Sequence, residues 1–178
     1  MKDSSSDIPH GYHITFNCYG ARLHGDEKGS IDRKHFNTVG SPTIPANQFW
    51  LKFERDSMDQ PPYILDQPRR KIVLNTIMEV CAYRGWYLWA LHIRSNHVHA
   101  VVSGLSKPEK ILNDFKSYSS RRLNEAGYDY KGRKRWERHG STQYKWSADT
   151  LADAIEYVIY EQGEPMECHI HDGDPPHW

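Results

Sequence analysis

Two histidines separated by a single valine stand in an apolar stretch of the chain. The stretch reads RSNHVHAVVSG over residues 94–104, and the pair is His97 and His99. Residues i and i+2 of a strand share one face, with their backbones about 6–7 Å apart. Imidazoles at this spacing are suited to binding one metal ion. His97 and His99 are therefore candidate metal ligands; the alternative is a pair of hydrogen-bonded strand histidines.

A second pair, His169 and His171, follows Cys168 near the end of the chain. These three side chains are of the types that bind zinc, which would make the protein a zinc-stabilised structural one. No further cluster of cysteines and histidines accompanies them, whereas zinc motifs usually come as two such clusters. We therefore expect this pair to be structural.

The periodicity of apolar residues predicts the elements that position the first pair. A strand is expected over 10–20, with His13, Thr15 and Asn17 on one face. A hairpin turning at Ser95–Asn96 should join strands over 86–94 and 97–104. Helices are expected over about 69–84, 108–125 and 148–162, with Gly85 ending the first and Ser147 capping the last. We expect an irregular insertion over 20–66, which contains a short strand or helical turn at 48–54. We expect an irregular acidic tail over 163–178.

The order of these elements indicates an α+β protein. Strand, helix, hairpin and helix follow one another as in the split β-α-β unit of ferredoxin-like folds. We expect an antiparallel sheet with the His-x-His pair on a central strand, a missing fourth strand in the insertion or near 140–146, and a further helix at the C-terminus. The 178 residues suit a single domain, 1–178.

The composition narrows the class of protein. Hydrophobic residues make up 38% and charged residues 26%, as in globular proteins. No apolar run approaches the roughly 18 residues that span a bilayer, and the N-terminus lacks the apolar region of a secretory signal. The three cysteines are odd in number and widely spaced. We expect a cytoplasmic protein with no membrane partner.

The net charge of zero hides an uneven distribution. Residues 107–145 hold 11 Lys and Arg against 5 Asp and Glu, whereas 146–178 hold 8 acidic residues and no Lys or Arg. The basic segment could bind a polyanion such as DNA; the alternative is a solvated helix face and loop. The candidates for phosphate contacts are Lys116, Arg121, Arg122, Arg133, Lys134, Arg135 and Arg138, the candidates for base stacking are Tyr130, Trp136 and Tyr144, and the loop 25–37 is a further candidate surface.

The form His-hydrophobic-His is typical of nucleases that cut single-stranded DNA with a tyrosine. Histidine-triad hydrolases would need a third histidine where Val101 stands, and two-histidine phosphoesterases would need separated His-x-Thr/Ser motifs. On the helix 148–162, Tyr157 lies at the edge of the apolar stripe and Tyr160 on the polar side, which favours Tyr157 as nucleophile. Glu161 shares the face of Tyr157, so Glu161 or its competitor Gln162 could complete a metal site.

These stretches together resemble the IS200/IS605-like transposases, the single-tyrosine HUH family, and especially its REP-associated branch. The resemblance is carried by YHITFNCYGARLHGDEKGSIDR, RSNHVHAVV, RHGSTQYKW and AIEYVIYEQG, in that order. It implies metal-dependent cleavage of single-stranded DNA near a hairpin, through a covalent 5′-phosphotyrosine. By position, His97 and His99 would be metal ligands and Tyr157 the nucleophile, and oxygen from Glu161 or Gln162 favours Mg²⁺ or Mn²⁺.

The chain also departs from the family pattern. Insertion-sequence members place a Gln ligand four residues after the tyrosine, where this chain has Glu161. The Asn-Pro pair of many REP-associated members is missing, and the insertion after the first strand is long. Domesticated REP-hairpin processing, replication initiation and non-catalytic hairpin binding stay open as alternatives, and so do a monomer and a homodimer. A bacterial, nucleoid-associated location follows from the resemblance.

Overall fold

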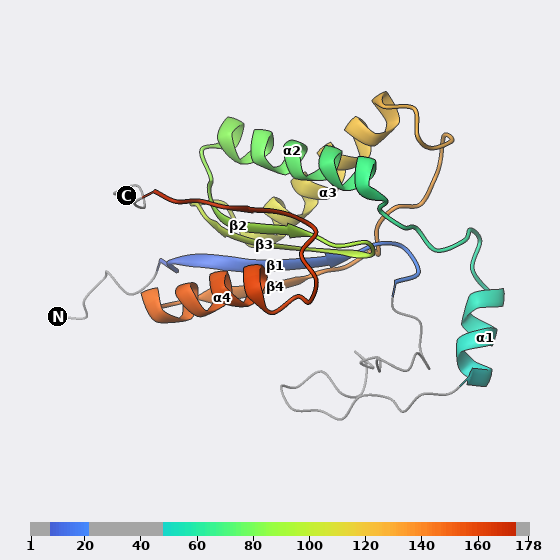
Figure 1. The fold of residues 1–178 in the computed structure, drawn as a ribbon, viewed down its shortest axis with the longest axis horizontal. Helices are drawn as coiled ribbons and strands as arrows, with labels where there is room; N and C mark the ends of the chain where they lie inside the picture. Colours follow the sequence, from blue (N-terminus) through green and yellow to red (C-terminus); the bar gives the residue numbers. More distant parts are fainter. Residues whose placement is uncertain (1–7, 22–47, 174–178) are drawn as a thin grey trace.

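A computed structural model describes residues 8–21 and 48–173 of the chain. The candidate DNA-binding loop 25–37 and most of the predicted insertion lie outside these residues. Five strands form one antiparallel sheet (Figure 1): β1 (Gly11–Asn17), β2 (Tyr87–Ile93), β3 (His97–Ser103), β4 (Ser141–Lys145) and β5 (Glu167–Ile170).

The strand order β4-β1-β3-β2-β5 confirms the ferredoxin-like prediction. The first four strands have the arrangement in which two β-α-β units interlock, so β1 and β3 lie at the centre and carry His13 and the His97–His99 pair. The hairpin is closed by the Arg94 amide, which donates to the His97 carbonyl at 2.8 Å. β4 is the strand expected near 140–146, paired with β1.

Two helices cover one face of the sheet: α2 (Gln67–Arg84) and α3 (Pro108–Glu125) lie together above it (Figure 1). The Asp66 side chain caps the start of α2, and Gly85 ends it with a φ of 69°, a conformation that glycine adopts readily. Ile14, Phe16 and Val98 point from the sheet into this layer, where they are fully buried against side chains such as Phe115. This layer is the main hydrophobic core, and it fixes which residues of β1 and β3 face the other way.

The last helix, α4 (Ala148–Tyr160), covers the opposite face of the sheet (Figure 1). Ser147 and Thr150 form a reciprocal capping box at its start. Of the predicted apolar stripe, Leu151 and Val158 are buried against the sheet at Ala90 and Val101, and Ile155 and Ile159 are partly buried there. Ala154, which was not in the predicted stripe, is buried as well. The helix therefore lies directly over the strand faces that carry the histidines.

Two segments differ from the sequence-based expectation. The stretch read as a short strand or helical turn is a helix, α1 (Gln48–Asp56), beside the sandwich (Figure 1). The tail predicted to be irregular contributes β5, which pairs with β2 and is held there by an ion pair between Arg70 and Glu167. Within the described residues, none of the helices has the length and apolar character needed to cross a bilayer.

Candidate nuclease site

A row of polar side chains crosses the sheet beneath α4. His92 of β2, His99 of β3 and Thr15 of β1 are direct cross-strand partners. They share the face of Val101 and Ala90, which pack on α4. The next row brings in His13, the partner of Val101. Residues far apart in the sequence therefore meet on one face because antiparallel register aligns them.

The two predicted metal ligands lie side by side on β3. The ring centroids of His97 and His99 are 4.9 Å apart, and the rings are nearly perpendicular. The His97 Nδ1 lies 2.7 Å from the Asn96 Oδ1, and the His99 Nδ1 lies 3.0 Å from the Thr15 Oγ1. Oxygen partners of this kind orient the ring in metal-binding histidines. Binding of one metal ion by this pair stays a prediction.

His13 is a member of the site that the motif search missed. Its Nε2 lies 3.1 Å from the His99 Nδ1 and 3.4 Å from the Thr15 Oγ1. Burial, with a smaller contribution from the Lys145 ammonium, lowers the pKa of His13 to about 4. His13 is therefore neutral at neutral pH and can share a hydrogen bond with His99 without repelling it. The sequence signal that could have identified His13 was its place on the same face of the first predicted strand as Thr15 and Asn17.

Tyr157 lies against both of these imidazoles. Its ring centroid is 5.8 Å from that of His13 and 5.9 Å from that of His99, with edge-on geometry in both cases. Tyr157 is 41% exposed, so the histidines contact one side of it and the other side meets solvent. Tyr160 is 72% exposed, as expected for the polar side of the helix. Of the two tyrosines, the fold brings Tyr157 to the histidines.

The two candidates for the third metal ligand, Glu161 and Gln162, come directly after the last residue of α4. Gln162 donates from Nε2 to the Tyr157 carbonyl at 3.1 Å, and Glu161, at the helix C-cap, is exposed. Over residues 8–21 and 48–173, no three His, Cys, Asp or Glu side chains form a group that could hold an ion. His97 and His99 are thus neighbours on β3, and the metal site, including its third ligand, stays a prediction.

The tail histidines are built into the sheet edge. The His171 Nδ1 accepts from the Gly173 amide at 2.9 Å and lies 3.1 Å from the Tyr87 hydroxyl. Cys168 and His169 are neighbours on β5, so their side chains point to opposite faces. This arrangement agrees with the structural role expected for the pair.

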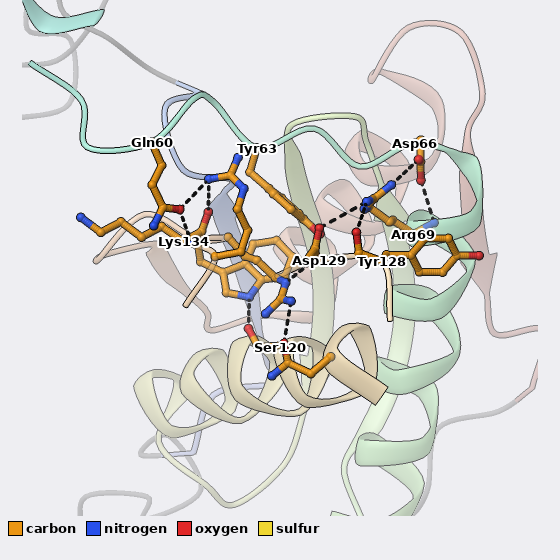
Figure 2. Close-up of polar contacts among 12 residues, drawn as sticks. Gln60, Tyr63, Asp66, Arg69, Ser120, Tyr128, Asp129 and Lys134 are labelled. Atoms are coloured by element: carbon orange, nitrogen blue, oxygen red, sulfur yellow. Dashed lines mark hydrogen bonds and ion pairs between the residues drawn. The ribbon is translucent and has the colours of Figure 1, made fainter. Parts of the chain in front are cut away.

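Several basic residues proposed for DNA hold the loop after α3 in place (Figure 2). Asp129 accepts hydrogen bonds from the Tyr63 hydroxyl at 2.7 Å and from the Arg135 Nε at 2.9 Å, and it pairs with Arg69. Arg133 donates to the Pro61 and Pro62 carbonyls. With only 6% of its surface exposed, Arg135 cannot present its guanidinium to DNA.

The other candidates divide into inward and outward side chains. Lys116 is buried and donates to the carbonyls of Glu137 and His139 at 2.8 and 2.9 Å. Trp136 packs edge-on against Phe16 and donates from its indole to the Lys116 carbonyl. The outward ones are Lys134, paired with Asp59; Arg122, paired with Glu79 and Glu125; Arg121, over the Tyr118 ring; and Arg138, which is exposed.

Comparison with known proteins gives one family, and the solved structures that resemble the chain include two transposases. The sequence model of the family described as "Transposase IS200 like" matches residues 62–161, more than half of the chain. A solved REP-associated tyrosine transposase bound to a REP hairpin is 9% identical, with a TM-score of 0.48, covering 90% of this chain and 71% of the other. A candidate transposase from Deinococcus radiodurans R1 is 13% identical, with a TM-score of 0.44; the match covers 89% of this chain and 95% of the other. No curated protein matches the sequence.

Proposed function

Because the chain belongs to the IS200-like transposases, we propose that it cuts and rejoins single-stranded DNA near hairpins, with Tyr157 as the nucleophile. The observation that carries the proposal is the placement of a half-exposed tyrosine ring within 6 Å of two buried histidine rings, by centroids. A buried tyrosine would pack without access to a substrate, and an isolated surface tyrosine would have no polar partners to order a phosphate.

The proposed reaction uses the hydroxyl of Tyr157 as the nucleophile. The Tyr157 oxygen attacks the scissile phosphorus in line and loses its proton to water. The bond from phosphorus to O3′ breaks, and the leaving oxygen takes up a proton to become a free 3′-OH. The product is a 5′-phosphotyrosine, which keeps the energy of the phosphodiester, so attack by another 3′-OH rejoins DNA without ATP.

A divalent ion, Mg²⁺ or Mn²⁺, is part of the proposal. When bound, it would polarise the phosphate and offset its developing charge. His97 and His99 would hold it, with an oxygen of Glu161 or Gln162 as the further ligand. Thr15 and Asn96 would keep the two imidazoles in orientation through their Nδ1 contacts.

DNA would be held by the cations that point outward. Arg121, Arg122, Lys134 and Arg138 are exposed, and phosphate contacts of this kind give affinity without sequence readout. We propose hairpin-bearing single-stranded DNA as the substrate class and the bacterial cytoplasm, near the nucleoid, as the location.

The test is covalent capture of the DNA. Wild-type protein is incubated with Mn²⁺ and a pool of labelled hairpin-bearing single strands, and the products are resolved on a denaturing protein gel. We expect a labelled protein band in wild type and in Tyr160→Phe, and no such band in Tyr157→Phe or His97→Ala. Tyr160→Phe is the matched control because Tyr160 lies one turn away on the exposed side.

Each other outcome has a definite meaning. Loss of the band in Tyr160→Phe alone would move the nucleophile one turn along α4. Tight DNA binding with no adduct in wild type, under any of the DNA sequences, would favour the non-catalytic hairpin-binding alternative and contradict the proposal.

A further inference from the structure

The C-terminal turn of α4 is anchored to the sheet by hydrogen bonds as well as by apolar packing. The last four carbonyls of a helix have no partner within it unless the chain or a side chain supplies one. The Tyr157 carbonyl accepts from the Glu161 amide at 3.2 Å and from Gln162. The Val158 carbonyl accepts from the Nδ1 of His92, on the neighbouring strand β2, at 2.9 Å.

His92 uses both ring nitrogens in this way. Its Nε2 accepts from the Met166 amide at 3.2 Å, in the segment that leads into β5. A carbonyl can only accept and an amide N–H can only donate, so His92 is the neutral tautomer with its proton on Nδ1. The side chain is only 1% exposed. One buried ring therefore joins the end of α4, the sheet and the segment that follows the helix.

The two hydrogen bonds of His92 lie close to the candidate site, both across the sheet and along α4. Across the sheet, His92 is the direct partner of His99. Along α4, Val158 directly follows Tyr157. The contacts of Val158 with Ala90 and Val101 are apolar and carry no directional preference. A hydrogen bond has a preferred direction, so the His92 bond limits how far the last turn can slide or rotate over the sheet.

We propose that His92 is a positioning residue for Tyr157: through the Val158 carbonyl and the Met166 amide it holds the last turn of α4 so that the tyrosine stays beside His13 and His99. The inference rests on the proposed function, because it assigns Tyr157 as the group to be positioned. A shift of about 1 Å at a reacting group can cost on the order of a hundredfold in rate.

Two substitutions separate the hydrogen bonds from the packing. His92→Phe keeps a ring and removes both nitrogens, whereas His92→Gln keeps one donor and one acceptor at similar separation. Under single-turnover conditions with saturating hairpin DNA, we expect His92→Phe to form the adduct at least about tenfold more slowly, with DNA affinity close to that of wild type. His92→Gln should recover most of the rate.

A control variant accounts for loss of stability. Cys81→Ala truncates a buried side chain in α2, on the opposite face of the sheet. It should lower the free energy of unfolding, measured in urea, and leave the adduct rate unchanged. If Cys81→Ala slows the adduct as much as His92→Phe does, or if His92→Phe reacts at the wild-type rate, the positioning role is wrong.

A second measurement does not depend on the chemistry. Nuclear Overhauser contacts between the rings of Tyr157 and His99 in the free protein should weaken in His92→Phe and return in His92→Gln. Unchanged contacts in His92→Phe would overturn the inference. Failure of wild type to form any adduct would instead overturn the proposed function, and the ring contacts would still test His92.

Discussion

Acid should destabilise the fold through His13. Its pKa is lowered from the ordinary 6.5 to about 4, first by burial and then by Lys145. The unfolded chain therefore binds a proton at this position at a higher pH than the native protein does. The part of the free energy of unfolding that depends on a neutral His13 is therefore fully present above pH 6.5 and is lost as the pH falls toward 4.

The size of the pKa shift of His13 sets how much free energy of unfolding is lost in acid. One pKa unit corresponds to 1.36 kcal/mol, so the full shift is worth about 3 kcal/mol, of which about 2 kcal/mol is lost by pH 5. The side chain is only 7% exposed, so solvent screens little of this effect. A loss of this size is a large part of the 5–15 kcal/mol that is typical of domains.

The assay is urea unfolding at pH 7.5 and pH 5.0, in buffer containing a chelator so that no metal holds the histidines. His13→Gln keeps a polar contact with His99 and cannot be protonated. Wild type should lose about 2 kcal/mol more than His13→Gln between the two pH values. His10→Gln, which removes an exposed histidine, should follow wild type. Equal losses in wild type and His13→Gln would refute the reasoning.

Three further predictions concern the basic segment. Asp129→Asn leaves the buried Arg135 guanidinium without its carboxylate, so the free energy of unfolding in urea should fall by about 3–5 kcal/mol; a change below 1 kcal/mol would contradict this. Lys116→Met leaves two loop carbonyls without their donor and should cost about 1–3 kcal/mol in the same assay while DNA affinity is kept. Arg138→Ala should weaken DNA binding and reduce the slope of log K against log salt by about 1; an unchanged slope would exclude a phosphate contact by Arg138.

The sequence predicted the sandwich well where apolar periodicity and turn residues agreed. α3 has the predicted bounds, and β3 ends one residue before its prediction. The alternation along β1 correctly placed His13 and Thr15 opposite Ile14 and Phe16. These elements face a large core on one side, so the pattern of buried residues is strong. Tyr157 could be preferred over Tyr160 for the same reason, since the stripe of α4 defines its orientation.

The prediction failed where tertiary pairing decides the structure. β5 reads ECHI, with charged and polar residues on an edge strand, and no local pattern separates it from an irregular tail. His92 and His13 have no motif around them. Their roles depend on which residue of a neighbouring strand lies opposite, and that register is set by the whole sheet.

The basic segment shows why a charge count is a weak guide to a DNA surface. The chain from 126 to 140 forms no helix or strand, so many of its backbone carbonyls need donors from outside the regular ladders. Lys116 and Arg133 together donate to five carbonyls in and around this segment. A surplus of cations beside an irregular loop therefore has two causes, phosphate binding and support of the loop backbone. Only the positions of the side chains distinguish them. Lys116 and Arg135 are buried, whereas Arg121, Arg122, Lys134 and Arg138 are exposed.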